Sequence, residues 1–274
     1  MTSRRPYRIL LWAVLILLGA AAPLLAYGPL MPWSPVHPGY SELRLQRARI
    51  LYPSDRQLPE AYHHVDEWIA QGETFHHLHA GRRITVVLCR DWSDFHRFAP
   101  WQTGRGAAGL SLATGDTIYI TPKVDEKRLD HAEFVRHELS HSILAQNASV
   151  LRTFVASRRD PWFQEGLAVW FGRQRAYDTQ AQFFDTAPAL GVGASLRSGY
   201  GGPDLRFGYI AWRNFLDYTD QTYGHERFTA FVHAANARPS EKYAIYRATF
   251  GIEWSEAVDR FERAVLTRSF TPRE

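Results

Sequence analysis

The sequence is poor in cysteine. Among its 274 residues only Cys89 is present, at the end of the apolar run 84–88. A single thiol cannot close an intrachain disulfide, and it excludes a cysteine-based zinc cluster. Any metal must therefore be held by His, Asp or Glu. The Cys89 thiol itself is expected to be buried on a strand, as a small apolar group.

Clustered charge of one sign is also absent. The chain has 32 Lys and Arg against 28 Asp and Glu, and its basic residues are scattered rather than gathered in one run. A nucleic-acid-binding surface needs basic residues clustered on one face. We therefore expect no nucleic-acid partner, and we interpret the mild net charge of +4 as a solvated basic surface.

Long hydrophobic runs are missing except at the N-terminus. Three arginines among the first eight residues precede an uncharged stretch from Ile9 to Ala26. As a helix this stretch would reach about 27 Å, close to the hydrocarbon thickness of a bilayer. A cleavable signal has a shorter apolar core and a small-x-small site, and here the best such site is followed directly by Pro23. Residues 1–27 are thus expected to be a retained signal anchor, with secretion after cleavage as the alternative.

The flanking arginines predict the orientation of this anchor. By the positive-inside rule they stay in the cytoplasm, so the body faces outward. In a bacterium this means a single pass through the inner membrane, with the body periplasmic or extracellular. The N-terminal helix would make the membrane a partner. Residues 28–40 contain four prolines and two glycines, and are expected to form a stiff linker.

The remaining chain predicts an α+β fold with two lobes. Residues 41–125 should form a small sheet lobe, because β-branched and apolar runs at 83–89, 107–113 and 117–121 are typical of strands. The tripeptide Thr114-Gly115-Asp116 is a turn signal between the last two. Helix-like apolar spacing covers 58–78, and a short helix is expected over 41–50.

Residues 126–274 should form a mainly helical lobe. Helices are expected at about 126–147, 161–171, 206–223, 225–236, 240–249 and 254–268. The Gly-rich segment 190–203, inside a stretch from 173 to 206, is expected to be a long loop, and long loops in compact domains are often functional.

A string of histidines precedes the first strand of this sheet lobe. It comprises His63, His64, His76, His77 and His79. These residues are spread over a predicted helix and a loop, and no fourth ligand stands in an obvious place. We interpret the string as a polar surface rather than a metal site.

The strongest motif is His137-Glu138-Leu139-Ser140-His141, an H-E-x-x-H pattern. On a helix, residues four apart stand about 5–6 Å from each other, so two imidazoles can bind one zinc ion. Glu138 lies about 100° round the helix from His137, where it borders the metal and can act as a general base. The surrounding apolar residues predict a buried helix, in which unpaired polar groups are costly. A metal ion explains why they are there.

A third ligand is expected on the next helix. Asp160 and Pro161 are suited to the N-cap and the first position of a helix that continues to Gly172. Glu165 is the only acid in this apolar helix, and Gly166 would let a neighbouring helix approach closely. Two histidines, a glutamate and an open fourth position form a catalytic zinc arrangement. The alternative is an acid at the edge of an amphipathic helix.

These two motifs resemble the gluzincin pattern HExxH … WxxEGxA. The second half is Trp162-Phe163-Gln164-Glu165-Gly166-Leu167-Ala168. The chain is most similar to the peptidase MA-like family of exported bacterial domains, over about residues 80–255. The resemblance implies a zincin fold of the thermolysin-like type. It also implies one Zn²⁺ ligated by His137, His141 and Glu165, with Glu138 as base.

The resemblance implies two further roles. The strand 117–121 would be a sheet edge along which a peptide substrate lies, so Ile118, Tyr119 and Ile120 are candidate substrate-binding residues. Tyr209, at the start of a later helix, is similar to a tyrosine that steadies the oxyanion in some relatives. Its rivals are Tyr200, Tyr218 and Tyr223.

Three departures narrow the class. Leu144 and Asn147 stand where the metzincin extension needs Gly and His, and the G-x-M-E-N segment of many aminopeptidases is absent. Because the G-x-M-E-N segment is absent, aminopeptidase specificity is unsupported. The gap between the histidine pair and Glu165 is longer than in thermolysin-type enzymes, which argues against close similarity to them.

The sequence thus predicts a membrane-anchored zinc metallopeptidase that hydrolyses peptide bonds in a peptide or protein. Two alternatives stay open. One is a non-catalytic, zinc-binding periplasmic module that binds a peptide or another partner. The other is a metal hydrolase acting on a non-peptide bond. A fourth protein ligand closing the zinc site would favour the non-catalytic module.

Overall fold

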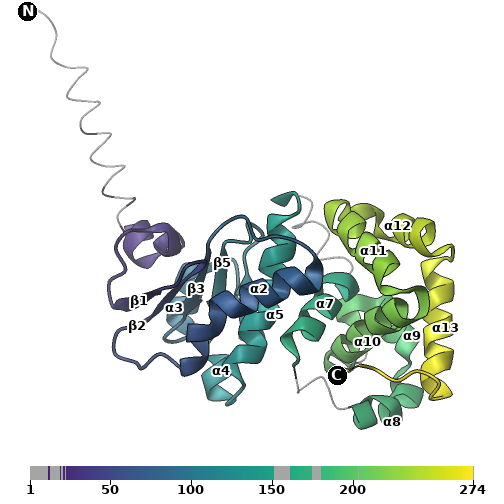
Figure 1. The fold of residues 1–274 in the computed structure, drawn as a ribbon. Coiled ribbons are helices and arrows are strands. Elements are labelled where there is room, and N and C mark those ends of the chain that lie inside the picture. The colour runs from purple at the N-terminus through teal and green to yellow at the C-terminus, as the bar shows by residue number, and fades with distance from the viewer. Residues whose placement is uncertain are drawn as a thin grey trace, which may run out of the picture.

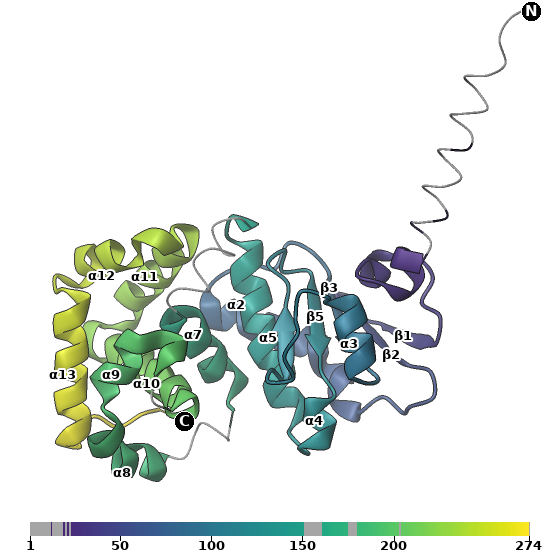
Figure 2. The same cartoon turned by 180° about the vertical axis from the view of Figure 1, so that it is seen from behind.

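The computed structural model in Figure 1 describes residues 12, 19, 21, 23–150, 161–174, 180–202 and 204–273. One five-stranded sheet lies among the residues that precede Lys123, and every described element from there on is a helix. Figure 2 shows the sheet at one end of the molecule and a group of helices at the other. The expected mixture of helices and one small sheet is confirmed.

The sheet has the order β1-β2-β3-β5-β4. Its strands are β1 (Tyr40–Arg44), β2 (Ala48–Pro53), β3 (Ile84–Leu88), β4 (Gly109–Ser111) and β5 (Thr117–Ile120). Strands β2, β3 and β5 are parallel, whereas β1 and β4 pair antiparallel at the two edges. The strands predicted within 83–89, 107–113 and 117–121 are confirmed.

The predicted short helix over 41–50 is wrong, because this segment belongs to the hairpin β1–β2. Its turn is stabilised by a residue distant in sequence. The Asp66 carboxylate accepts from the backbone N–H groups of Gln46 (2.7 Å) and Arg47 (3.1 Å). Ile50 is buried against the sheet core. Local spacing contains neither contact, so it could not separate strand from helix here.

The expected edge strand is also wrong. Strand β5, which covers 117–120, is paired on both sides, with β3 and with β4. The three candidate substrate-binding side chains Ile118, Tyr119 and Ile120 are buried. On this side the edge of the sheet is the short strand β4. The chain reverses at Gly115 (φ +71°) between β4 and β5, and β4 pairs with the outer side of β5.

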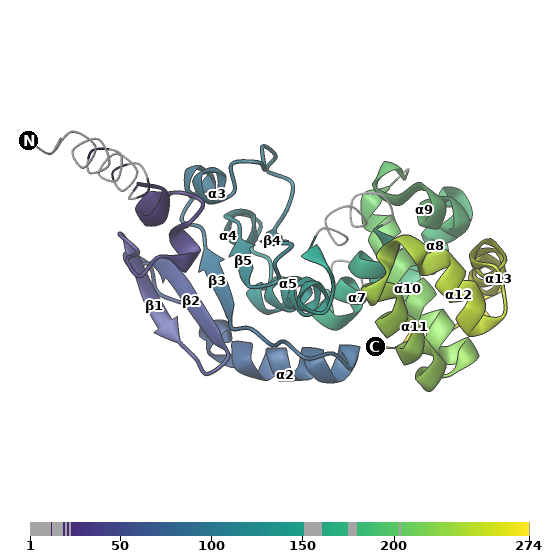
Figure 3. The same ribbon diagram turned by 90° about the horizontal axis from the view of Figure 1, so that it is seen from above.

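Helices cover both faces of the sheet. On one face α2 (Val65–His76), preceded by the 3₁₀ turn η2 (Glu60–His64), packs with α5 (His131–Gln146) over Ile50, Val86 and Ile118. On the other face α3 (Trp92–Phe98) packs over Leu51, Val87 and Tyr119. Figure 3 shows α2 and α3 on opposite sides of the strands. Helix α5 therefore packs directly against one face of the sheet.

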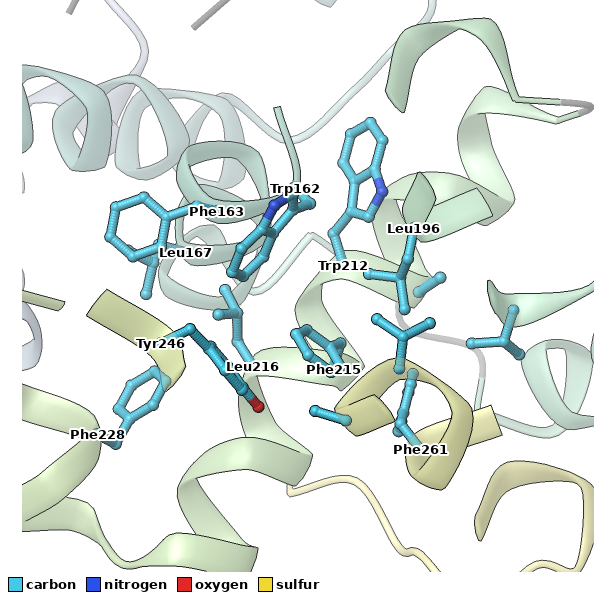
Figure 4. Close-up of a cluster of buried hydrophobic side chains, with 14 of the residues drawn as sticks. Trp162, Phe163, Leu167, Leu196, Trp212, Phe215, Leu216, Phe228, Tyr246 and Phe261 are labelled. Carbon is cyan, nitrogen blue, oxygen red and sulfur yellow. The ribbon is translucent and has the colours of Figure 1, made fainter. Parts of the chain in front are cut away.

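The second group consists of helices that bury a shared aromatic core (Figure 4). They are α7 (Trp162–Gly172), α8 (Gln180–Leu190), α9 (Val192–Ser198), α10 (Leu205–Tyr223), α11 (His225–Ala237), α12 (Lys242–Phe250) and α13 (Trp254–Leu266). The described residues also form the short elements η1 (Met31–Trp33), α4 (Lys123–Glu126), η4 (Gly199–Gly201) and η5 (Pro239–Glu241). The helices predicted from 161 onward are confirmed within a few residues.

The long loop predicted over 190–203 is wrong. Most of this segment is α9 and η4. Val192 and Leu196 of α9 are buried in the core that Trp212 of α10 also enters. Tertiary packing thus overrides the helix-weakening effect of the glycines.

No helix in the described parts of the chain is long and apolar enough to cross a membrane. This finding contradicts the prediction of a single pass through an inner membrane with an outward-facing body. The longest described helix, α10, has 19 residues and includes Arg213, Asp217 and Asp220, which no bilayer interior would favour. Most of the stretch 9–26, on which that prediction rested, lies outside the described residues.

Candidate metal centre

Helix α5 presents the H-E-x-x-H residues. It begins after Asp130, whose carboxylate accepts from the backbone N–H of Ala132 (2.8 Å), an N-cap contact. Val135, Leu139 and Ile143 are buried toward the sheet. His137 and His141, four residues apart, share another face of the helix, with ring centroids 4.9 Å apart. The predicted buried helix is confirmed.

Helix α7 presents Glu165. Its Gly166 lies against α10, where an added Cβ would come within 2.9 Å of the Trp212 carbonyl oxygen. The close approach of the two helices therefore requires glycine, as the sequence predicts. Pro161 takes the N-cap position, and the expected cap Asp160 lies outside the described residues. Buried Trp162 and Phe163 hold the first turn of α7 in the aromatic core.

These two helices bring three donor atoms together. The Nε2 atoms of His137 and His141 are 3.2 Å apart, and Glu165 Oε2 lies 3.3 Å from the first and 3.6 Å from the second. Ligands at about 2.0–2.1 Å from a tetrahedral zinc stand about 3.3–3.4 Å from one another. The spacing of the three side chains therefore fits one zinc ion. Among the described residues, they are the group of three that could hold a metal.

The charges of the three side chains favour a cation between them. Burial by itself raises the pKa of Glu165, but His141 and His137 outweigh it and hold the pKa well below the usual range. Burial lowers the pKa of His141, but the Glu165 carboxylate outweighs it and raises the pKa. A buried carboxylate facing two imidazoles thus requires positive charge. A divalent metal supplies it without protonating a histidine.

Gln174 orients the first histidine. Its Oε1 accepts from Nδ1 of His137 (3.1 Å), and both side chains are buried. A proton fixed on Nδ1 leaves the lone pair of Nε2 directed toward His141 and Glu165, which is the tautomer that a metal ligand needs. No sequence motif marks Gln174, which follows α7 and lies 37 residues beyond His137.

The Glu138 side chain extends from α5 to the edge strand β4. Its side chain is buried, and a Cβ added to Gly109 would lie 2.5 Å from Glu138 Oε1. The Ser111 backbone lies close enough to the Glu138 carboxylate to lower its pKa slightly. Burial raises the pKa of Glu138, although His137 and His141 oppose this. The neighbours of this carboxylate thus include the histidine pair and the backbone of β4.

Two of the candidate tyrosines lie at the centre. Tyr200 donates a hydrogen bond to Glu165 Oε1 (2.6 Å), whereas the ring centroid of Tyr209 is 6.5 Å from that of His137. Tyr218 and Tyr223 pack against the helical core instead. Tyr200 therefore holds the carboxylate, and Tyr209 stands beside a histidine.

A scan against protein-family models finds no match for this chain, and a search among curated proteins finds none either. Solved structures give weak likenesses. An M1 zinc metallopeptidase from Deinococcus radiodurans aligns with a TM-score of 0.47 and 15% identity, over 85% of this chain and 52% of that one. A mutant of that organism's enzyme bound to a Tyr-Ser-Ala substrate aligns at 0.44 and 18%, over the same shares.

Such similarities are too low to establish a shared fold or activity. The chain also spans about half the length of the solved structures that it matches.

Proposed function

We propose that this protein is a zinc-dependent peptidase with a zincin fold. The observation that carries the proposal is the placement of Glu138. It is a buried carboxylate that faces a three-residue metal-binding group on one side and a strand edge on the other. A structural metal site needs no free carboxylate at this position. A hydrolytic site requires one, because water must lose a proton as it attacks.

His137, His141 and Glu165 would hold the ion. When bound, zinc polarises a carbonyl oxygen and lowers the pKa of water to about 7. Glu138 takes the proton from the attacking water and later passes it to the leaving amine. In the metal-free protein, burial raises the pKa of Glu138 toward neutral pH, and a general base works best when its pKa approaches the working pH.

The substrate would lie along β4. Among the described residues this strand is paired on one side only, with β5. An extended peptide can add to such an edge through main-chain hydrogen bonds, which do not depend on side-chain identity. The Glu138 carboxylate lies beside this edge, because a Cβ added to Gly109 would be 2.5 Å from its Oε1. The substrate role first expected for Ile118–Ile120 therefore passes to Gly109–Ser111.

The two tyrosines receive separate roles. Tyr209, beside His137, is the candidate to donate a hydrogen bond to the oxyanion that forms when the carbonyl is attacked. Tyr200 positions Glu165 through its 2.6 Å hydrogen bond. The Tyr200 side chain is 45% exposed, but desolvation around its hydroxyl and the neighbouring Glu165 carboxylate raise its pKa, so the hydroxyl keeps the proton that it donates.

The non-catalytic alternative requires a closed site. Within the described ranges the metal-capable group has three members, not four. Three protein ligands leave one position for water or substrate, as in catalytic zinc sites. The geometry therefore favours the peptidase.

The direct test replaces Glu138 by Gln and compares the variant with wild type on an unbiased peptide library. We expect the variant to keep one equivalent of zinc at the centre and to lose turnover by about 10²–10⁴-fold, the usual contribution of a general base. Glu133→Gln, at the other acid of α5, is the matched control and should cleave like wild type.

Wild-type turnover in Glu138→Gln would refute the assigned mechanism. If zinc-loaded wild type cleaves no library member, the peptidase proposal fails, and a non-peptide substrate or a binding role takes its place.

A further inference from the structure

A second pair of histidines lies on the surface, outside the candidate centre. His77 follows α2, and His225 is the first residue of α11; 148 positions separate them. Their Nε2 atoms face each other at 3.2 Å, and their ring centroids are 5.4 Å apart. Both side chains are exposed to solvent. His77 belongs to the histidine string predicted to be polar surface, of which His76 is instead buried, and the fold gives His77 a partner.

The second imidazole is backed by a carboxylate. Asp220, near the end of α10, accepts from His225 Nδ1 (3.0 Å) through its Oδ1. Its other oxygen accepts from Arg273, so the carboxylate is held in place. A carboxylate on the far nitrogen fixes the tautomer that leaves Nε2 free to ligate, an arrangement found behind metal-bound histidines. The lone pair of His225 Nε2 is thereby directed at His77.

The backbone around His77 has an unusual conformation. His77 caps the C-terminus of α2 in the left-handed region, with φ +51° and ψ +35°. A non-glycine residue adopts this conformation at some cost, and it is worth explaining where it occurs. Here it ends the helix, and the imidazole of the residue that adopts it meets α11. Figure 3 shows α2 running beneath α5 toward the group of helices that includes α11.

We propose that His77 and His225 form a second site for a divalent transition-metal ion. Imidazole ligands suit Zn²⁺, Cu²⁺ and Ni²⁺ rather than Ca²⁺ or Mg²⁺. The 3.2 Å separation equals that of His137 and His141 in the buried centre, and it fits two ligands of one tetrahedral ion. Water completes the coordination, because the pair is open to solvent. The ion would clamp α2, which covers the sheet, to the corner between α10 and α11.

The test counts zinc by equilibrium dialysis of the full-length protein, up to millimolar free metal. We expect two equivalents for wild type and one each for His77→Asn and His225→Gln. Asn suits position 77 because it is among the residues enriched at positive φ. His141→Gln should also bind one equivalent, at the surface pair, and the double variant His77→Asn/His141→Gln none. His63→Asn, in the same histidine string, is the matched control and should bind two.

These arms separate the two sites. If the buried centre failed and the surface pair held, wild type would bind one equivalent, His141→Gln would leave that number unchanged, and His77→Asn would abolish it. A single equivalent in wild type that His77→Asn does not alter would overturn the second site, leaving only a hydrogen bond between two imidazoles. So would two equivalents in both His77→Asn and His225→Gln. Circular dichroism in metal-free buffer checks that each variant is folded.

A second measurement uses the clamp. A ligand that binds only the folded state raises the unfolding midpoint as its concentration rises. In the His141→Gln background, zinc should raise the midpoint, and adding His77→Asn should abolish that rise. An equal rise in both proteins would contradict the proposal.

Discussion

The two histidine pairs of this protein have the same spacing and different surroundings. In each pair the Nε2 atoms are 3.2 Å apart. In each, the Nδ1 of one ring donates to a side-chain oxygen, Gln174 for His137 and Asp220 for His225. Both pairs therefore have the spacing that one shared metal ion needs, once between segments distant in sequence and once within a single helix.

The two pairs differ in their burial, in the presence of a third donor and in the neighbouring carboxylate. The pair in α5 is largely buried and has a third donor in Glu165, whereas the side chain of His225 is 65% exposed. Only the buried pair has a carboxylate like Glu138, poised between the donors and a strand edge. We infer from this contrast that imidazole spacing sets the capacity to bind a metal, whereas burial, a third ligand and a neighbouring base would set the chemistry.

The largest effect should come from breaking the buried pair. His141→Gln removes one of three ligands of the centre, and peptide cleavage should fall by about 10³-fold or more, because several kcal/mol of metal-based stabilisation are lost. His77→Asn should leave cleavage unchanged. Rates on one library peptide at saturating zinc compare the two directly. Equal losses in both variants would erase the functional distinction between the pairs.

A smaller effect should come from moving the base without touching a ligand. In Gly109→Ala, the new methyl group would lie 2.5 Å from Oε1 and 2.6 Å from Cγ of Glu138, so the whole side chain must shift. Misplacement by about 1 Å costs about 10²-fold in rate, whereas zinc content and unfolding midpoint should stay near wild type. Gly106→Ala is the control, since no atom lies within 4 Å of its added Cβ. Wild-type turnover in Gly109→Ala would mean that Glu138 does not act from this position.

The smallest effect should come from the residue behind the metal ligand. Gln174→Leu keeps the volume but removes the acceptor for His137 Nδ1. Zinc affinity at the centre should fall by about 10–100-fold, the usual loss for such partners. Gln174→Glu, which keeps an oxygen there, should retain affinity. Competition with a chelator measures both, and unchanged affinity in the Leu variant would show that the hydrogen bond does not orient the ring.

Much of the fold follows from local pattern. The strand 84–88 and helices α5, α7 and α10–α13 were predicted because their apolar spacing is strong and continuous. The hairpin at 40–53 and helix α9 were not, because each depends on distant contacts. Asp66 caps the turn of the hairpin, and the core around Trp212 buries Leu196. The prediction that β5 forms the edge of the sheet is wrong for the same reason, since tertiary contacts set the order of strands in a sheet.

The residues of the candidate centre were likewise predictable from sequence only where a local pattern marks them. The motif residues His137, Glu138 and His141 are separated by helical spacing alone, so sequence could place them together, and the structure brings Glu165 to them. Their ligand and base roles remain proposals. Gln174 and the strand edge at Gly109 could not be foreseen, because the contacts that bring them to the centre cross about 30 residues or more without a recognisable motif.

The central claim is one zinc ion held by His137, His141 and Glu165. Anomalous diffraction from crystals of the zinc-loaded protein, recorded on both sides of the zinc edge, tests it most directly. The account predicts a peak at about 2.0–2.2 Å from both Nε2 atoms and from a Glu165 oxygen, with no fourth protein ligand and Glu138 outside the coordination sphere. A peak bound by four protein side chains, or none between these three residues, would contradict it.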